Sequence, residues 1–228
     1  MTTNYPYNLH DGHLIVEFDE LRTLVDTGAP TSVSEHTCIN VADTTYNANA
    51  TYLGVTTNTL SENIGCPIDA LLGADILNRY DVALDPTTST MTLNDHEIPL
   101  PGTVMPLDLF QGIPIVTAQI GGQDTRLFFD TGAKLSYLNG DLVMPYPSTS
   151  SATDFYPGIG TFETDLRSVP IELGEVDVSL STGQLPDMLA LALQMANVSG
   201  ILGTEILDHF RVYYAPRRKK WALERLSN

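Results

Sequence analysis

The chain has 228 residues, of which 43% are hydrophobic and 17% are charged, a composition that supplies a substantial core for one or two domains. Acidic residues outnumber basic ones by 28 to 11, which gives a formal net charge of −17. This charge argues against nucleic acid or an anionic membrane as the main partner, because both require a cationic protein face.

Two further features narrow the class of protein. The two cysteines, Cys38 and Cys66, have neither the spacing of a zinc site nor that of a disulfide framework. The longest apolar run, at 188–196, is about half the length that spans a bilayer, and residues 1–13 lack the pattern of a signal peptide. We therefore expect a cytoplasmic protein that does not bind membranes; the alternative is a protein of another compartment from which a leader has been removed.

In chain order, the first predicted elements form a β-hairpin. Residues 13–18 (HLIVEF) and 21–26 (LRTLVD) are rich in β-forming residues, and only Asp19 and Glu20 separate them. The tetrapeptide Asp-Thr-Gly-Ala follows at 26–29. We predict that this tetrapeptide forms the loop at the end of the hairpin.

The same arrangement returns in the second half of the chain. Residues 114–120 (PIVTAQI) and 125–130 (TRLFFD) flank a turn at 121–124, and a second Asp-Thr-Gly-Ala follows at 130–133. A given tetrapeptide recurs by chance on the order of once in a thousand chains of this length. The repeat therefore indicates a duplicated unit.

Further matches follow each tetrapeptide. Ser32 and Ser136 both come six residues after the Asp, and we interpret them as structural hydrogen-bonding residues rather than nucleophiles. Farther on, residues 71–93 match 201–223, each with two branched residues, a glycine, a short helical turn and two strands. We interpret the basic run at 217–220 as a solvated turn between the last two strands.

The two halves differ in length. The second half holds 26 more residues between its Asp and its later glycine motif, and we place much of this insertion at 168–200, with a helix at about 187–195. A proline-containing connector at 94–112 separates the halves. The predicted lobes are therefore residues 1–102 and residues 103–228.

Two loops of this kind that face each other would bring Asp26 and Asp130 together. Two neighbouring carboxylates cannot both ionise cheaply, so they share one proton and titrate as a coupled pair. One carboxylate then draws a proton from a water molecule while the other protonates a carbonyl oxygen. This arrangement predicts direct hydrolysis of an amide, with no covalent intermediate, metal or cofactor.

These motifs resemble those of the pepsin and retropepsin clan of aspartic peptidases. The two loops and the hydrophobic-hydrophobic-Gly signatures at 71–73 and 201–203 carry the resemblance, which covers most of residues 13–223. It implies an all-β fold of two retropepsin-like β-barrel lobes, and an endopeptidase with Asp26 and Asp130 as its catalytic residues. It also implies a supporting role for the loop residues that follow them, namely Thr27, Gly28, Ala29, Thr131, Gly132 and Ala133.

The resemblance further implies a flap, a β-hairpin that closes over the substrate. Tyr52 and Gly54 lie 26 and 28 residues after the first Asp, and Tyr156 and Gly158 lie at the same offsets after the second. Single-chain pepsins use the hairpin of the first half, whereas retroviral dimers use both. We favour residues 154–162 as at least one working flap; the alternative for the two tyrosines is simple packing in the core.

The sequence departs from the family pattern just after the Asp-Thr-Gly motifs. Pepsins carry Ser or Thr where Ala29 and Ala133 stand, and the missing hydroxyl should leave the carboxyl pair less acid-shifted. We therefore predict a mildly acidic optimum, around pH 4–6. Retroviral enzymes carry acidic residues where Lys134 stands; we expect its side chain to point to solvent, although near the pair it would lower a carboxyl pKa.

Other interpretations stay open. Asp26 and Asp130 could simply close two turns, or the chain could be a non-catalytic peptide-binding or regulatory module that keeps the cleft. His10 and His13 form a faint metal-binding pattern, but we expect no metal. As an enzyme, the protein is expected to be a monomer that cuts peptide or protein substrates with apolar residues around the scissile bond, and to bind pepstatin-type inhibitors.

Overall fold

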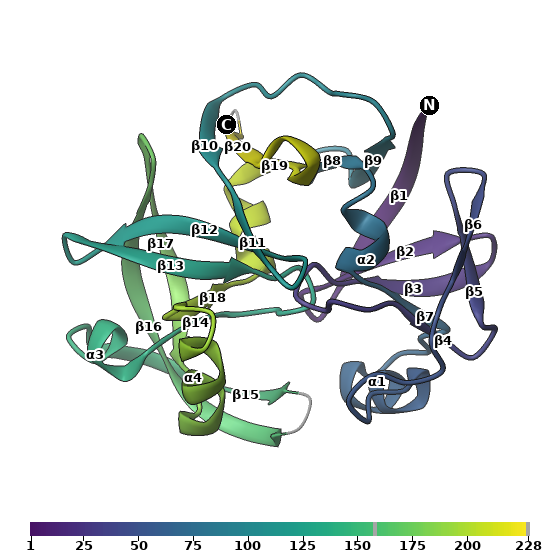
Figure 1. Cartoon of the computed structure of the whole chain (residues 1–228). Coiled ribbons are helices and arrows are strands. Elements are labelled where there is room, and N and C mark those ends of the chain that lie inside the picture. The colour runs from purple at the N-terminus through teal and green to yellow at the C-terminus, as the bar shows by residue number, and fades with distance from the viewer. Residues whose placement is uncertain (157–158, 227–228) are drawn as a thin grey trace.

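The computed structural model describes residues 1–156 and 159–226. Strands account for 53% of the chain and helices for 14%, which confirms the predicted all-β class. Figure 1 shows the first half, in purple and blue, on one side of the molecule and most of the second half, in teal and green, on the other.

Three sheets contain the strands. The first has ten strands, in the order β10 (Thr103–Pro106), β20 (Lys220–Arg225), β19 (Phe210–Ala215), β8 (Asp81–Asp85), β9 (Thr90–Asn94), β1 (Thr2–His10), β2 (His13–Phe18), β3 (Leu21–Val25), β7 (Ala70–Leu72) and β4 (Val33–Ser34). The second has eight, in the order β11 (Asp108–Phe110), β12 (Ile113–Ile120), β13 (Gln123–Phe129), β18 (Gly200–Leu202), β14 (Ser136–Leu138), β17 (Val176–Gln184), β16 (Gly160–Leu173) and β15 (Ser148–Tyr156). The third is a small hairpin of β5 (Cys38–Val41) and β6 (Thr44–Asn47).

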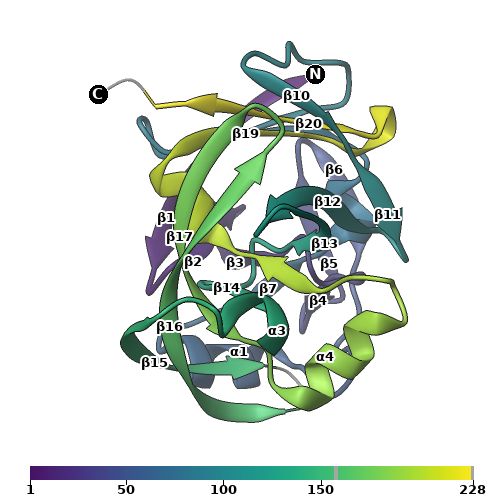
Figure 2. The same ribbon diagram turned by 90° about the vertical axis from the view of Figure 1, so that its left-hand side faces the viewer.

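The helices are short. They are α1 (Thr57–Ile64), α2 (Ala74–Leu77), α3 (Gly140–Val143), α4 (Asp187–Gln194) and the 3₁₀ turns η1 (Thr204–Asp208) and η2 (Pro216–Arg218). The predicted helix near 187–195 is thus confirmed, and so are the two short helical turns, α2 and η1. The view in Figure 2 places α4 and α3 at the end of the molecule opposite β19 and β20.

The two predicted hairpins form where the turn residues allow them. Strands β2 and β3 pair antiparallel, and Asp19 and Glu20 between them have φ angles of 45° and 71°. Strands β12 and β13 pair in the same way around Gly121 and Gly122, with φ angles of 58° and 78°. Positive φ at both central residues gives the twist that two-residue hairpins require.

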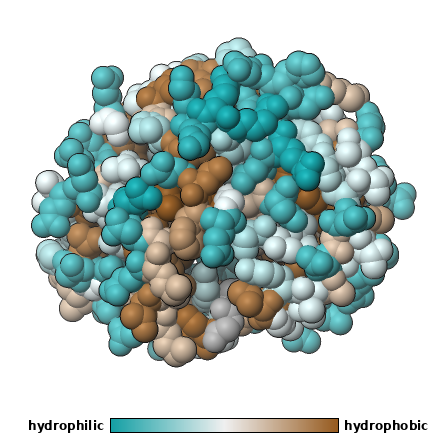
Figure 3. Space-filling model, in the orientation of Figure 1, coloured by the Kyte–Doolittle hydropathy of each residue, from teal (hydrophilic) through white to brown (hydrophobic). Residues whose placement is uncertain are grey.

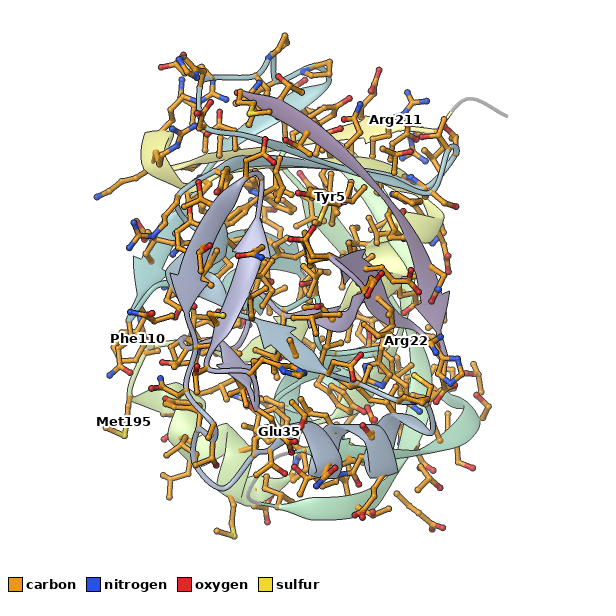
Figure 4. The ribbon with its side chains drawn as sticks, turned by 90° about the vertical axis from the view of Figure 1, so that its right-hand side faces the viewer. Tyr5, Arg22, Glu35, Phe110, Met195 and Arg211 are labelled. Carbon is orange, nitrogen blue, oxygen red and sulfur yellow. The ribbon has the colours of Figure 1, made fainter. Side chains whose placement is uncertain are left out.

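Strand β1 was not predicted, because its polar residues alternate with few apolar ones. It bridges β2 and β9 in the ten-stranded sheet. In Figure 4 the labelled Tyr5 lies on this strand; its ring packs edge-on against Phe18, with centroids 4.7 Å apart. Its hydroxyl accepts a hydrogen bond from the Ala42 N–H at 2.9 Å, so β1 also fixes the turn between β5 and β6.

The last strands of the two halves share one sheet. Strand β8 of the first half pairs antiparallel with β19 of the second, and one apolar core extends beneath both halves. In this core Phe129 packs against Tyr214 and Trp221, with ring centroids 6.4 and 5.9 Å away. Each half also has a smaller apolar cluster of its own, centred on Leu71 in the first and Ile201 in the second.

The basic run at 217–220 is not simply a solvated turn, so that interpretation was wrong for two of its residues. It does form the turn between β19 and β20, but Arg217 and Arg218 bind the carboxylate of Asp81 at 3.0 and 2.5 Å. Asp81 is completely buried. Because Asp81 belongs to the first half, this ion-pair cluster ties the halves together.

Candidate active site

Each Asp-Thr-Gly-Ala loop begins where a central strand ends. Strand β3 lies parallel to β7, and the Asp26 N–H donates to the Leu72 carbonyl at 3.0 Å. In the second half β13 lies parallel to β18, and the Asp130 N–H donates to the Leu202 carbonyl at 2.9 Å. The same local pairing therefore positions both aspartates.

The threonines of the two loops bind each other reciprocally. The Thr27 N–H donates to Thr131 Oγ1, and the Thr131 N–H donates to Thr27 Oγ1, both at 3.0 Å. Each hydroxyl then donates across to the opposite strand, Thr27 to the Phe129 carbonyl and Thr131 to the Val25 carbonyl, both at 2.7 Å. All four bonds join residues more than 100 positions apart, so they hold the two loops face to face.

The glycine of each loop lies against the aspartate of the other. A Cβ atom added to Gly28 would lie 2.3 Å from the Asp130 carboxyl carbon, and one added to Gly132 would lie 2.4 Å from that of Asp26. No side chain fits at such distances, so glycine is required at both positions. The structure thus brings together Asp26, Asp130 and the six predicted loop residues at one point between the halves.

The two carboxyl groups also bind each other. Asp26 and Asp130 share a side-chain hydrogen bond, while the Ala29 N–H donates to Asp26 Oδ1 and the Gly132 N–H to Asp130 Oδ1, each at 2.9 Å. Burial and the neighbouring carboxylate raise the pKa of Asp26 well above its usual range. Burial also raises the pKa of Asp130, but the hydrogen bond from Asp26 opposes this rise. The pair is therefore arranged to retain one proton at a pH where an exposed aspartate has lost it.

The two predicted serines anchor the loops from below, as expected for structural residues. Ser32 Oγ accepts the Gly73 N–H at 2.9 Å, and Ser136 Oγ accepts the Gly203 N–H at 3.1 Å. The loop carbonyls are bound as well: Ala29 accepts from the Ala74 N–H at 2.8 Å and Ala133 from the Thr204 N–H at 2.9 Å. These contacts explain why the glycine motifs at 71–73 and 201–203 accompany the Asp-Thr-Gly loops.

A cleft of about 550 Å³ lies over the pair. Its wall on the side of the first half is mainly apolar, with Leu24, Val33, Leu60, Ile64 and Leu71, and on the side of the second half it includes Tyr137, Phe162, Leu189 and Ile201. Figure 3 shows apolar side chains at the lower left and lower centre of this face, the region where Figure 1 places α4 and β15.

The predicted flap residues lie in a short turn in the first half and at a long hairpin in the second half. Tyr52 forms a narrow turn with Val55, with N–H to carbonyl distances of 3.1 and 2.8 Å, and Gly54 at its tip has a φ of 82°. Tyr156 ends β15, the first strand of a long hairpin with β16. Gly158 lies outside the described residues. Both tyrosines line the cleft.

Tyr156 lies close to the carboxyl pair. Burial raises its pKa, and the charges of Asp130, Asp26 and Tyr52 raise it further. A phenol held in this way stays protonated and remains a hydrogen-bond donor. Tyr156 also packs against the apolar cluster of the second half that contains Ile201, so it lines the cleft and contributes to this cluster at the same time.

Lys134 does not point to solvent, so that expectation was wrong. Its side chain is only 18% exposed, and its Nζ lies 2.9 Å from Asp11 Oδ2 and 3.9 Å from Asp154 Oδ1. The cause is the turn between β1 and β2, which packs on the loop: a Cβ at Gly12 would lie 2.7 Å from the Lys134 Cβ. This contact joins residues that sequence patterns do not relate.

His13 is a site residue that the sequence analysis missed. It lines the cleft, and its Nδ1 lies 2.9 Å from the Gly132 carbonyl oxygen. Its only signal in the sequence is the motif His-Asp-Gly-His at 10–13, a faint metal-binding pattern that gives no indication of a contact with the second loop. Among the described residues, no cluster of three His, Cys, Asp or Glu side chains is arranged to hold a metal ion; Cys38 and Cys66 are free thiols.

Comparison with models of known protein families gave no match, and no curated protein sequence matches this chain significantly. The resemblance to aspartic peptidases therefore depends on the residues and the geometry described above. In the part of the chain that the structure describes, no helix has the length and apolar character needed to cross a membrane.

Proposed function

We propose that this protein is an aspartic endopeptidase with the two-lobed fold of the pepsin and retropepsin clan. One observation carries the proposal: two Asp-Thr-Gly loops from different halves meet through reciprocal threonine hydrogen bonds and bring Asp26 and Asp130 into contact. Turn chemistry alone gives no reason for these long-range bonds, which argues against the two aspartates being ordinary turn residues.

The chemistry follows from the shared proton. The ionised carboxylate accepts a proton from a water molecule, which attacks the carbonyl carbon of the scissile amide. The protonated carboxyl donates its proton to the carbonyl oxygen, giving a tetrahedral diol. Proton transfer to the amide nitrogen then allows the C–N bond to break, and the pair returns to its starting state with one proton.

The cleft supports a peptide as the substrate. An extended peptide places its side chains alternately on opposite sides, and the apolar residues on both walls would accept apolar side chains next to the scissile bond. Tyr52 and Tyr156 bracket the cleft above the carboxyl pair. Tyr156, on the longer hairpin, is the stronger candidate for the residue that closes over the substrate.

A non-catalytic peptide-binding module is the second candidate. Its binding cleft would be the same, but it would not need a proton-sharing pair. The raised pKa values of Asp26 and Asp130 favour the enzyme, because perturbed carboxyl groups in a cleft are typical of catalytic sites.

The test is cleavage of an internally quenched peptide library from about pH 3 to pH 7, with and without pepstatin. Asp26→Asn and Asp130→Asn should each abolish turnover, whereas Asp124→Asn, an exposed position on β13, the strand that leads to Asp130, serves as the matched control. Peptide binding without cleavage at any pH would support the binding module. Cleavage that survives both active-site substitutions would refute the mechanism.

A further inference from the structure

The turn between β1 and β2 packs against the second Asp-Thr-Gly loop at several points. Asp11 binds Lys134 at 2.9 Å, and the Gly12 carbonyl accepts a hydrogen bond from Thr204 Oγ1 at 2.5 Å. The turn of the first half thus packs on the loop of the second half, and the next residue, at the start of β2, contacts Gly132 of that loop.

That residue is His13. Because the Gly132 carbonyl oxygen can only accept, the Nδ1 atom 2.9 Å away must carry the hydrogen. Gly132 in turn donates its N–H to Asp130 Oδ1 at 2.9 Å, and its Cα packs against the Asp26 carboxyl group. His13 therefore fixes the one residue that contacts both carboxyl groups from the second loop.

Among the described residues, no side chain binds the Gly28 carbonyl of the first loop in the way that His13 binds that of Gly132. The segments 12–16 (GHLIV) and 112–116 (GIPIV) occupy equivalent places before their hairpins, so Ile113 stands where His13 stands in the other half. Ile113 lines the cleft, but its side chain has no hydrogen-bond donor and no charge. The surroundings of the two aspartates are therefore unequal at this one position.

We infer that His13 is a positioning residue that makes the carboxyl pair unequal, with Asp130 as the ionised base and Asp26 as the proton-bearing acid. This inference builds on the proposed function. The hydrogen bond to Gly132 holds the N–H that stabilises an ionised Asp130, and a protonated imidazole adds a positive charge on the same side.

The charges around His13 agree with this assignment. Burial lowers the pKa of His13, while the hydrogen bond to Gly132 and the charges of Asp154 and Asp11 oppose this, and Lys134 lowers it again. His13 in turn lowers the pKa of Asp130, against the larger effect of burial. Acidification therefore places an imidazolium beside the carboxylate assigned as the base.

The experiment compares His13→Gln, which keeps an N–H donor but has no charge, with His13→Ile, the residue of the other half. Carboxyl ¹³C NMR titration follows both aspartates, with Asp26→Asn and Asp130→Asn used for assignment. In the native protein Asp130 should ionise first. Both His13 variants should raise the lower apparent pKa of the pair by on the order of one pH unit, a tenfold change in proton concentration.

Activity gives a second measurement. In the pH profile of kcat/KM, the acid limb should shift to higher pH by the same amount in both variants. Only His13→Ile should also lower kcat, because its side chain no longer holds Gly132 of the second loop. A double variant, His13→Ile with Ile113→His, exchanges the two environments and should make Asp26 ionise first.

The titration separates this inference from the proposed function, because it requires no substrate. An unchanged titration in both His13 variants would overturn the role of His13, even if the protein cleaves peptides. If the His13 variants shift the titration as expected but the native protein cleaves no peptide, the proposed function is refuted. The coupling between His13 and Asp130 would still hold.

Discussion

The two halves of the molecule agree closely at the loops and diverge above them. The hydrogen bonds that the two aspartate N–H groups donate to the neighbouring strands are 3.0 and 2.9 Å long. Those that the two glycine N–H groups donate to the serine hydroxyls are 2.9 and 3.1 Å long. Over the cleft, however, the first half has a two-residue turn at Leu53 and Gly54, while the second has the long β15–β16 hairpin and α4. The two halves therefore share their geometry where the carboxyl groups meet and differ in the elements that lie over the cleft.

The cleft walls show a second difference between the halves. Pro30 and Ile113 line one end, whereas Lys134 and His13 occupy the equivalent places at the other. One end is therefore apolar, and the other contains a partly buried group of ionisable side chains that includes Asp154. The two ends of the cleft therefore differ chemically, whereas a two-fold symmetric cleft would have identical ends.

We expect the largest effect from a substitution that removes the ion pairs between the two halves. Asp81→Ala removes the buried partner of Arg217 and Arg218, and leaving these charges without it should cost about 3–5 kcal/mol of unfolding free energy. Urea denaturation followed by fluorescence measures this. As a control, Asp108→Ala breaks an exposed pair with Arg126 and should cost at most about 1 kcal/mol; equal costs for the two would contradict the structure.

The next prediction tests whether the loops are equivalent. Gly28→Ala and Gly132→Ala each place a methyl group inside the opposite carboxyl group, so each should lower kcat by about a hundredfold or more. Steady-state kinetics on the same peptide measures both. Gly140→Ala is the control, since its φ is not positive and an added Cβ would meet only the end of the flexible Gln184 side chain, at 3.3 Å; a tolerated Gly132→Ala would mean that the loops do not face each other.

A smaller effect should be shared by both threonines. Thr27→Val and Thr131→Val each remove a buried hydroxyl that donates one hydrogen bond and accepts another. Each should destabilise the fold by about 1–3 kcal/mol, and by similar amounts. Thermal unfolding compares the two variants. A loss of stability in only one of them would show that the hydrogen bonds of the two threonines are not equivalent.

The smallest effect concerns pH. The folded pKa of Asp26 is raised above the ordinary aspartate value of 3.8, so the folded state binds this proton more tightly than the unfolded chain. The resulting stabilisation is fully present below about pH 3.8 and is lost as the pH rises through the folded pKa. Asp26→Asn should therefore raise the Tm by a few degrees at neutral pH, with the gain disappearing toward acid pH; a lower Tm at neutral pH would contradict the raised pKa.

Much of the scaffold could be predicted from local sequence. The hairpins before each loop, the short helices after 71–73 and 201–203, and the helix at 187–194 are where the residue patterns place them. These elements depend on turn residues and on apolar periodicity within a few positions of one another. Strand β1 escaped prediction because its pairing with β9, some 90 residues away, and not its composition, makes it a strand.

The sequence by itself determined that one unit is present twice and that each copy carries an Asp-Thr-Gly loop at a strand end. Only the tertiary structure decided how these loops meet, which turn clamps Lys134, and that His13 lies beside one carboxyl group and not the other. The physical reason is distance along the chain. Contacts between residues more than 100 positions apart depend on how the two halves pack. The conformational preferences of short segments do not determine that packing.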